Sequence, residues 1–299
     1  MSSAPQDASS VVAVVDPALA EINDFCAGLK LERSIKVSDG KFGRVSVWRH
    51  VPTQYLFLKK TIKLKHYNEV EPMIHSLMSN HKYFIKLYYS VTTLKSHVLI
   101  MDYVKGGDLF ELLKTEDHLS TTEAKLIVRQ LCEGLHALHS HHIIHNDIKL
   151  ENILYNRYKH IKIADYGLCK IVGQESCYDG TIDYFSPEKI NHHRYDFHFD
   201  WWAVGVLTYE LLCGEGEHPF KKECNEVLTV DKLAGRQQQQ KLHFNRNNFN
   251  KDAQTFIVNM LKYNINYRLH KYSEIIKYDF LNYSLAYSFR PLHAYKFLA

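Results

Sequence analysis

The 299-residue sequence predicts an α+β fold in which short strands come first and helices follow. Three observations support this prediction. Short segments of the first hundred residues have the apolar and aromatic character of strands, such as Tyr55 to Lys60 and the pair around Phe84 to Ile100. A helical spacing of apolar residues follows the capping sequence Ser120 to Glu123. The stretch from Asp200 to about Leu212 is apolar enough to be a buried helix. A chain of this length has room for one large domain or for two lobes.

Composition and charge are ordinary for a soluble globular protein. The formal net charge of +4 is too small to indicate a nucleic-acid-binding protein, so we expect no direct nucleic-acid partner. The six cysteines form no C-x-x-C pair and no metal-ligand spacing, which favours a reducing compartment. The apolar run Val11 to Val15 is short and is stopped by Asp16 and Pro17, so it is neither a signal peptide nor a membrane span. We therefore expect a soluble, intracellular protein with no membrane partner.

The N-terminal segment precedes the first strands. Residues 1 to about 10 are small and polar, and we expect them to be disordered. From Pro17 to Leu31 the apolar residues fall at helical spacing, which predicts an amphipathic helix. The apolar face of this helix must dock on something.

The stretch from Ile143 to Gly167 carries the most informative polar residues. The alternating segment Ile161 to Ala164 predicts a strand that leads into Asp165. Loops at strand ends would then present four side chains to one cleft, namely Asp147, Lys149, Asn152 and Asp165. Asp147 can accept the proton of an attacking hydroxyl, while Asn152 and Asp165 supply the oxygen ligands that Mg²⁺ prefers. With Lys149 to neutralise charge on a moving group, the set predicts phosphoryl transfer.

The run His145 to Asn152 and the following Asp165-Tyr166-Gly167 resemble the H-R-D-L-x-x-x-N catalytic loop and the D-F-G motif of protein kinases. Asn146 and Tyr166 depart from that pattern. The resemblance covers about residues 30 to 280 and implies the bilobal protein-kinase fold, with a small β-rich N-lobe that carries one regulatory helix and a larger, mainly helical C-lobe. It implies ATP and Mg²⁺ as cofactors. It divides the chain into an N-terminal extension (1–28), an N-lobe (29–102), a C-lobe (103–290) and a tail (291–299).

The resemblance assigns nucleotide-binding roles in the N-lobe. The segment from Val37 to Val45 resembles the phosphate-covering hairpin G-x-G-x-x-G-x-V, with Gly40, Gly43 and Val45 in place and Ser38 where the first glycine is usual. The strand Tyr55 to Lys60 resembles the V-A-I-K strand. We assign its phosphate-binding lysine to Lys59, which places Phe57 where a small residue usually covers the adenine. Lys60 stays open as the alternative, because a slip of one residue reverses the faces of a strand.

Further matches continue the resemblance. Glu71 matches the helix residue that pairs with that lysine, and Pro72 requires the helix to begin just before it. Met101 to Asp108 resembles the connection between the lobes, which assigns Met101 to the back of the pocket, the backbone of Asp102 to Val104 to the adenine, and Asp108 to a ribose hydroxyl.

The C-terminal half resembles the family at its structural positions. The segment ending in Ser186-Pro187-Glu188 resembles an activation segment that ends in A-P-E, and Thr181 matches the threonine beside the catalytic Asp of serine/threonine kinases. Asp200 matches a residue that holds the catalytic loop, and Arg268 matches the partner of Glu188. The tract Gln237 to Gln240 predicts a surface loop. The aromatic tail from Leu281 is expected to pack on a lobe.

Two departures agree with each other. Asn146 replaces the Arg that often grips a phosphorylated residue, and Cys177 stands where that phosphoacceptor is expected. We expect activity without activation-loop phosphorylation, although Ser176 and Tyr178 remain as acceptors. The Glu71 helix then needs another support, either the N-terminal segment or a second copy of the protein in a homodimer.

Two acidic residues predict the substrate. Glu151 and Glu210 match positions that face an Arg of the substrate in basophilic kinases, which predicts an Arg-rich protein partner; the alternative is that both are merely solvated. The loop with Asn146 and the Tyr-, Asn- and His-rich composition resemble viral kinases of the baculoviral serine/threonine group, which implies the cytoplasm or nucleus of an infected host cell. Two rival functions are a pseudokinase acting as a nucleotide-binding regulatory module and a small-molecule phosphotransferase.

Overall fold

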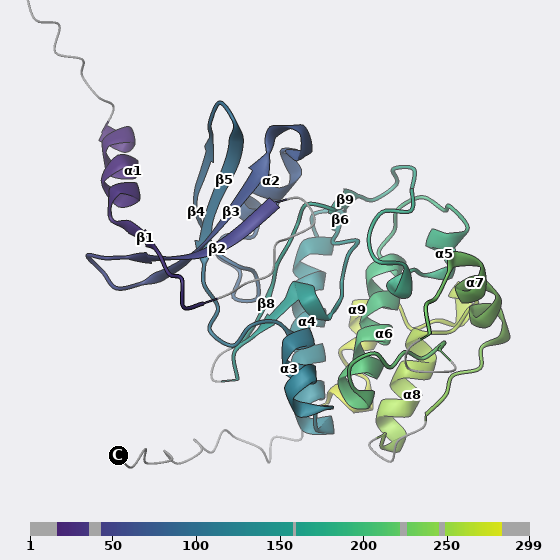
Figure 1. The fold of residues 1–299 in the computed structure, drawn as a ribbon. Helices are drawn as coiled ribbons and strands as arrows, with labels where there is room; N and C mark the ends of the chain where they lie inside the picture. The colour runs from purple at the N-terminus through teal and green to yellow at the C-terminus, as the bar shows by residue number, and fades with distance from the viewer. Residues whose placement is uncertain (1–16, 36–42, 158–159, 222–225, 245–248, 283–299) are drawn as a thin grey trace, which may run out of the picture. The chain divides into compact units, whose positions relative to one another are not determined.

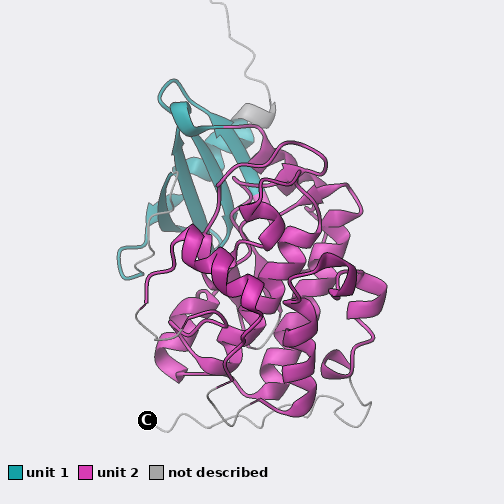
Figure 2. Ribbon diagram, turned by 90° about the vertical axis from the view of Figure 1, so that its right-hand side faces the viewer, with its two compact units in different colours: residues 1–67, 88–103 teal, residues 68–87, 104–299 magenta. Residues whose placement is uncertain are grey.

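The structure, a computed structural model, describes residues 17–35, 43–157, 160–221, 226–244 and 249–282. The chain divides into two compact units, coloured separately in Figure 2. Residues 1–67 and 88–103 form the first unit, and residues 68–87 and 104–299 form the second. The sequence places residues 68–87 in the N-lobe, but they group with the second unit. Within the second unit, Phe84 forms a backbone bridge with Ile163, and the backbone N–H of Ile85 donates to the hydroxyl of Tyr166.

A five-stranded sheet forms most of the first unit, with the strand order β1-β2-β3-β5-β4 (Figure 1). The elements are β1 (Leu29–Leu31), β2 (Gly43–His50), β3 (Leu56–Lys63), the 3-10 helix η1 (Leu64–His66), β4 (Leu87–Thr92) and β5 (Ser96–Asp102). The pairs β1–β2, β2–β3 and β3–β5 are antiparallel. Three residues of β3 are buried: Lys60 and Ile62 on one face of the strand and Phe57 on the other.

Helix α1 (Pro17–Ala27) ends four residues before Leu31, the predicted end of the N-terminal helix. Gly28 follows the helix and donates its backbone N–H to the carbonyl of Asp24. Leu29–Leu31 then pair with Trp48–His50 as β1. The prediction was wrong over this last turn because pairing with β2, distant in sequence, outweighs the local helical spacing.

Phe25 carries the contact between α1 and the sheet. Its ring centroid lies 4.9 Å from that of His50, 5.2 Å from that of Phe57 and 4.7 Å from that of Tyr89. Aromatic pairs at these separations add to the free energy gained from burial alone. Through Phe25, the helix therefore docks on the sheet of its own unit.

The second unit is mainly helical. Its helices are α2 (Val70–Leu77), α3 (Leu109–Glu116), α4 (Thr121–His139), α5 (Pro187–Ile190), α6 (His198–Cys213), α7 (Val230–Gln239), α8 (Lys251–Met260) and α9 (Tyr272–Ile275). Its short strands are β6 (Ile143–Ile144), β7 (Ile153–Tyr155), β8 (Ile161–Ile163) and β9 (Lys170–Ile171), and its 3-10 helices are η2 (Leu150–Asn152), η3 (Ile182–Tyr184), η4 (Ile265–Tyr267) and η5 (Asp279–Leu281). Strand β6 pairs with β9, and β7 pairs with β8, both antiparallel.

Helix α6 is the core of this unit, as its apolar sequence predicts. Every residue from Phe199 to Cys213 is buried, and the helix packs against α4 and α8. Ser120 caps α4 by accepting the backbone N–H of Glu123 at 3.2 Å, as the capping sequence predicts. The Glu123 carboxylate does not complete the capping box but bonds to Arg157 at 2.7 Å.

Gln237 belongs to α7 and not to a surface loop. Its side chain is buried and donates from Nε2 to the carbonyl of Phe185 at 2.8 Å. Thr229 caps the N-terminus of α7 by accepting the backbone N–H of Lys232. The loop prediction was wrong because a glutamine tract carries no signal of the tertiary hydrogen bond that buries one of its members.

Some predictions fall outside the described residues. These are the roles of Ser38 and Gly40, the packing of the tail after residue 282 and the boundary at 290. No helix in the described ranges is long and apolar enough to cross a membrane.

Candidate active site

The loop after β6 is held by the buried carboxylate of Asp200 on α6. Oδ2 accepts the backbone N–H of His145 and Oδ1 accepts that of Asn146, both at 2.8 Å, while Nε2 of His139 lies 2.8 Å from Oδ2. Burial alone would raise the pKa of Asp200, but the hydrogen bond and charge of His139 outweigh it and hold the pKa below its usual value. The predicted role of Asp200 as the residue that holds this loop is confirmed by these two backbone hydrogen bonds.

Three of the predicted residues converge on the carboxylate of Asp147. Thr181 Oγ1 donates to Asp147 Oδ1 at 2.9 Å and accepts from Lys149 Nζ at 3.1 Å. Lys149 Nζ lies 3.6 Å from Asp147 Oδ2. Asn152 Nδ2 donates to both the backbone carbonyl of Asp147, at 2.7 Å, and its Oδ2, at 3.1 Å. A carboxylate held from three sides beside an ammonium group is arranged to accept a proton from a positioned hydroxyl.

Two oxygen-bearing side chains lie at the ends of the β7–β8 hairpin. The backbone N–H of Ala164 donates to the carbonyl of Asn152 at 3.0 Å, which ties the end of β8 to η2. Asp165 follows directly, half-buried, with a positive φ of 60°. Because the Asn152 amide donates its N–H groups to Asp147, its Oδ1 faces away from Asp147. The amide oxygen of Asn152 and the carboxylate of Asp165 are a fitting pair for Mg²⁺, which commonly takes one or two protein oxygens and completes its shell with phosphates and water.

Tyr166 stands fully buried where the resembled motif has Phe. Its hydroxyl donates to the carbonyl of Ile163 at 2.6 Å and accepts the backbone N–H of Ile85 at 3.0 Å. The ring contacts that of His75 on α2 at 4.6 Å. The extra hydroxyl is thus satisfied inside the unit, so this departure is compatible with a well-packed site.

Glu71 lies at the start of α2 and is buried. Pro72 is the third residue of the helix, which agrees with the requirement that it lie near the helix start. Asn68 orders this start by accepting the backbone N–H of Val70 at 3.1 Å and donating to the carbonyl of Gly167 at 3.3 Å. The ion pair of Glu71 with Lys59 or Lys60 would join the two units and stays a prediction.

The predicted substrate residues differ in exposure. Glu151 is exposed, whereas Glu210 on α6 is buried and accepts a hydrogen bond from the hydroxyl of Tyr184. Burial raises the pKa of Glu210 to about 8, and the neighbouring charges of Glu151 and Asp183 add to this rise. Lys221 lies 3.3 Å from Asp183. A buried carboxyl that is hard to ionise alone is suited to a cationic partner.

In the first unit, the strand register separates the two candidate lysines. Lys60 pairs with Val45 and Leu58 pairs with Met101, so these residues share one face of the sheet. Lys59 pairs with Ser46 on the opposite face, where its ammonium lies 4.6 Å from the centre of the Trp48 ring. Lys60 is only 5% exposed. The register therefore places Lys60, and not Lys59, on the face of Val45, which favours Lys60 as the candidate phosphate-binding lysine.

The same register revises the place of Phe57. Its side chain lies on the face opposite to Val45 and contacts Phe25, so it is Leu58 that shares a face with Val45 and Met101. Val45 lines an open hollow together with Leu31 and Val47.

Gly43 is the first residue of β2 and lies two residues before Val45. A Cβ built on Gly43 would lie 2.6 Å from the carbonyl oxygen of Thr61, so the close approach of the two strands requires glycine there.

The remaining nucleotide-binding predictions concern three further residues. Met101 is 4% exposed at the end of β5, and Asp102 accepts a hydrogen bond from the Tyr88 hydroxyl at 2.8 Å. In the second unit, Asp108 caps α3 by accepting the backbone N–H of Glu111 at 2.9 Å. Burial raises the pKa of Asp108. The backbone role predicted for Asp102 to Val104 and the ribose contact of Asp108 stay predictions.

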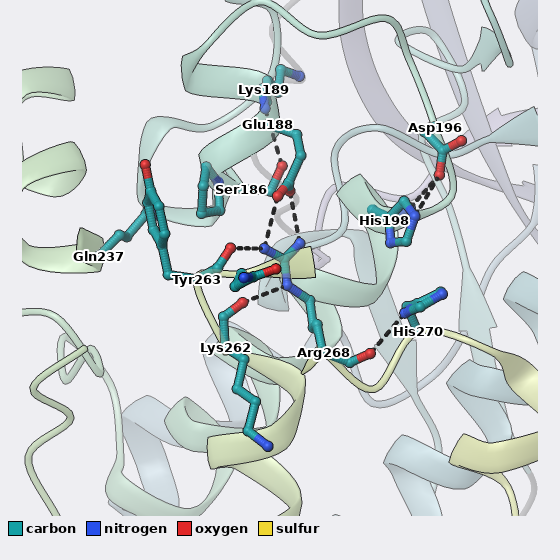
Figure 3. A network of polar contacts seen from close by, with 12 residues as sticks. Ser186, Glu188, Lys189, Asp196, His198, Gln237, Lys262, Tyr263, Arg268 and His270 are labelled. Carbon is teal, nitrogen blue, oxygen red and sulfur yellow. Dashed lines mark hydrogen bonds and ion pairs between the residues drawn. The ribbon is translucent and has the colours of Figure 1, made fainter. Parts of the chain in front are cut away.

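Glu188 and Arg268 form the predicted ion pair, which Figure 3 shows from close by. Arg268 Nη1 and Nη2 donate to the two carboxylate oxygens of Glu188 at 2.7 and 2.8 Å. Arg268 Nε donates to the carbonyl of Lys262 at 2.7 Å, and the guanidinium lies over the Trp202 ring at 4.7 Å. Both side chains are buried. The pair is confirmed and fastens α5, the end of the segment that carries Thr181, to the chain before α9.

Sequence reasoning missed a set of charged residues beside the loop. Lys189 is buried directly after Glu188, and its ammonium lies 2.6 Å from Oδ1 of Asn146 and 3.1 Å from Oδ1 of Asp179. A lysine that follows a Ser-Pro-Glu run gives no sequence signal of burial, since lysine is usually exposed.

Comparisons with known proteins agree with one another. The sequence profile described as "Protein kinase domain" matches residues 31–281. The chain is 53% identical over 264 residues to serine/threonine-protein kinase 1 of Heliothis zea nuclear polyhedrosis virus, covering 88% of this chain and 97% of that one. It is 47% identical to the kinase of the same name in Lymantria dispar multicapsid nuclear polyhedrosis virus, covering 88% and 95%. The solved structure of the Cydia pomonella granulovirus kinase PK-1 superimposes with a TM-score of 0.79 at 36% identity, covering 89% and 99%.

Proposed function

The chain belongs to the protein kinase domain family and is a serine/threonine protein kinase, and on this premise we propose that it transfers the γ-phosphate of ATP, with Mg²⁺, to Arg-rich protein substrates. The observation that carries the proposal is the contact of Thr181 Oγ1 with both Asp147 and Lys149. Through it, the segment that is expected to hold the peptide touches the proton acceptor and the charge-neutralising lysine. Positioning of this kind supplies most of the catalysis in phosphoryl transfer.

Each side chain then has a role. Asp147 orients the attacking hydroxyl and accepts its proton, and Lys149 neutralises charge on the phosphoryl group as it moves. Asn152 Oδ1 and the Asp165 carboxylate would hold Mg²⁺, which neutralises phosphate charge when bound. Lys60, on the face of Val45, is the lysine that we assign to the α and β phosphates.

The direct test is transfer of labelled γ-phosphate from ATP to an Arg-rich Ser/Thr peptide and to an acidic one. We expect label on the Arg-rich peptide in the presence of Mg²⁺ and much less on the acidic peptide. If neither peptide is labelled while ATP still raises the melting temperature, the protein is a nucleotide-binding regulatory module. Labelling of sugars or antibiotics alone would instead indicate a small-molecule phosphotransferase.

The preference for Arg rests on Glu151 and Glu210. Glu210 is buried, and the nearby carboxylates of Glu151 and Asp183 make the site electronegative. A guanidinium group forms charge-assisted, often bidentate hydrogen bonds with carboxylates, so it is the cation that this site favours. Glu151→Ala should therefore raise the KM for Arg-containing peptides and leave the KM for ATP unchanged; an equal rise for peptides without Arg would count against this role.

The ionisation of Glu210 gives a pH-dependence prediction. Because the pKa of Glu210 lies at about 8 before substrate binds, its carboxyl is largely neutral at pH 7, and a guanidinium binds better to the ionised form. We expect the KM for an Arg peptide to fall by about 30-fold between about pH 6.5 and pH 9, since the ionised fraction of a carboxyl with a pKa of about 8 rises from about 3% to about 90%.

Two controls separate this effect from other titrations. Glu210→Gln cannot ionise and should flatten the profile, and a peptide with Ala in place of Arg should show no comparable fall. Equal pH dependence of the two peptides with the wild-type protein would contradict the assignment.

A second prediction concerns the lysine pair in β3. Lys60→Met should lower kcat/KM by about 10²-fold, the size found when one preorganised donor to developing charge is removed. Lys59→Met is the matched control: it loses the contact with Trp48 on the opposite face and should retain kcat within about twofold. The reverse order of effects in a steady-state assay would restore Lys59.

We also propose that activity does not require phosphorylation of the segment between Gly167 and Ser186. Asn146 donates to the carboxylate of Asp179, so the position that usually grips a phosphate already has an internal anion as partner. Protein treated with phosphatase, with removal of phosphate verified by intact mass, should keep its kcat. Loss of turnover after this treatment, restored by rephosphorylation, would overturn the proposal.

A further inference from the structure

A partly buried group of polar side chains joins the segment before Thr181 to the catalytic loop. We call it the Asp179 cluster; it consists of Asn146, Lys170, Asp179, Lys189 and Tyr195. All five residues belong to the second unit. None of them is among the residues that the phosphoryl-transfer chemistry uses directly.

The carboxylate of Asp179 is the centre of the cluster. Its Oδ1 accepts from Asn146 Nδ2 at 3.1 Å and from the Tyr195 hydroxyl at 2.9 Å, and it lies 3.1 Å from Lys189 Nζ. Lys170 Nζ lies 3.1 Å from Oδ2. Two ammonium groups and two neutral donors therefore converge on one anion. A phosphorylated side chain that orders a loop is bound by a similar set of cationic and neutral donors.

The buried ammonium of Lys189 requires the Asp179 carboxylate as its counter-charge. Lys189 is only 2% exposed, and its ammonium lies among the rings of Phe185, Tyr195 and Phe199, at 4.6 to 5.9 Å from their centres. A buried ammonium without a counter-charge is costly, and removing one partner of a buried pair is strongly destabilising. Burial would raise the pKa of Asp179, but Asn146, Lys189 and Lys170 lower it to about 2. The anion is thus permanent at physiological pH.

The cluster contacts the chemistry on two sides. Asn146 directly precedes Asp147 and has a positive φ of 67°, a conformation that needs support from its surroundings. Thr181, which bonds to Asp147, comes two residues after Asp179. Between them Gly180 has a φ of +98°, and a Cβ there would lie 3.0 Å from the carbonyl oxygen of Asn146 and 3.4 Å from Asp147 Oδ1. Asp179 therefore fixes both the residue before the proton acceptor and the residue that touches it.

We propose that Asp179 is a positioning residue that acts as a built-in anion and holds Thr181 against Asp147, in place of a phosphorylated side chain. The inference rests on the proposed function, since it names the group that makes activation-segment phosphorylation unnecessary. Asp179 acts through Asn146, Lys189 and Lys170 and has no direct contact with the substrate in this proposal.

The test compares three variants: Asp179→Asn, Lys189→Met and the double variant. Asp179→Asn keeps the size of the side chain and removes its charge, so we expect kcat to fall by about 10- to 100-fold, a range typical of coupled neighbouring groups, with the KM for ATP unchanged. The melting temperature should also fall, because Lys189 loses its counter-charge. In the double variant no unpaired ammonium remains at position 189, so the melting temperature should recover while kcat stays low.

The outcomes separate positioning from folding. If kcat recovers in the double variant together with the melting temperature, Asp179 is merely structural and the proposal is overturned; the same holds if folded Asp179→Asn keeps wild-type kcat. Glu116→Gln, which breaks the distant ion pair with Arg157, is the control and should leave kcat unchanged.

A readout without turnover keeps this inference apart from the proposed function. Hydrogen exchange of the backbone amides of residues 179–184 should be faster in Asp179→Asn than in the wild type and should stay fast in the double variant. If the wild type transfers no phosphate to any peptide, the proposed function fails, and the exchange rates still decide whether Asp179 orders the segment. Unchanged exchange in Asp179→Asn would reject that role.

Discussion

Asp147→Asn is expected to lower kcat by about 10² to 10⁴, the usual cost of losing a general base. An amide has the same shape as the carboxylate but cannot accept the proton of the attacking hydroxyl. It also replaces one of two acceptor oxygens, while Thr181 Oγ1 and Asn152 Nδ2 both donate to the wild-type carboxylate. The measurement is steady-state transfer of phosphate to an Arg-rich peptide, with ATP binding followed by thermal shift.

A matched control separates the chemistry from the substitution itself. Asp117 is an exposed aspartate in the same unit, and its φ of 62° is a value at which Asn is tolerated as well as Asp. Asp117→Asn should keep wild-type kcat and melting temperature. If Asp147→Asn retained more than about a tenth of wild-type kcat, well above the range for a lost general base, the role of Asp147 as proton acceptor would be wrong.

The second large effect is on stability. Arg268→Met should lower the free energy of unfolding by about 3 to 5 kcal/mol, because it leaves the Glu188 carboxylate buried without its partner. Three further contacts of Arg268 are lost with the charge: those to the carbonyls of Lys262 and Tyr263 and to the ring of Trp202. The measurement is urea unfolding followed by circular dichroism.

The neighbouring pair Lys271–Glu274 provides the comparison. It lies 3.5 Å apart with side chains that are 63% and 53% exposed, so Lys271→Met should change the free energy of unfolding by less than about 1 kcal/mol. A double variant, Arg268→Met with Glu188→Met, removes both buried charges and should recover part of the loss. Equal effects of Arg268→Met and Lys271→Met would refute the view that burial makes the first pair important.

The catalytic loop could be predicted from the sequence because its chemistry is local. Asp147, Lys149 and Asn152 lie within six consecutive residues, and their spacing alone brings them to one loop. The family resemblance also predicted two contacts between residues far apart in the sequence. Asp200 bonds to the catalytic loop, and Arg268 bonds to Glu188. The viral relatives confirm the resemblance itself.

Sequence patterns are not sufficient where a distant partner decides the outcome. The lysine choice depended on which residue of β3 faces Val45, and only the register with β2 settles a period-two pattern. Gln237 reads as polar surface but is buried because the carbonyl of Phe185 accepts its amide. Lys189 is buried because Asp179 and Asn146 supply its partners, which no local pattern announces.

The hydroxyl of Tyr166 has a consequence for conformational populations. If its ring left the buried position, the backbone N–H of Ile85 would keep only its bond to the carbonyl of Ile163, and that carbonyl would lose the Tyr166 hydroxyl. A typical hydrogen bond contributes about 0.5 to 1.5 kcal/mol net, so the displaced conformer should be populated about 2- to 13-fold less than in Tyr166→Phe. A small molecule that binds only after this ring has moved should bind the wild type more weakly than the Phe variant by the same factor.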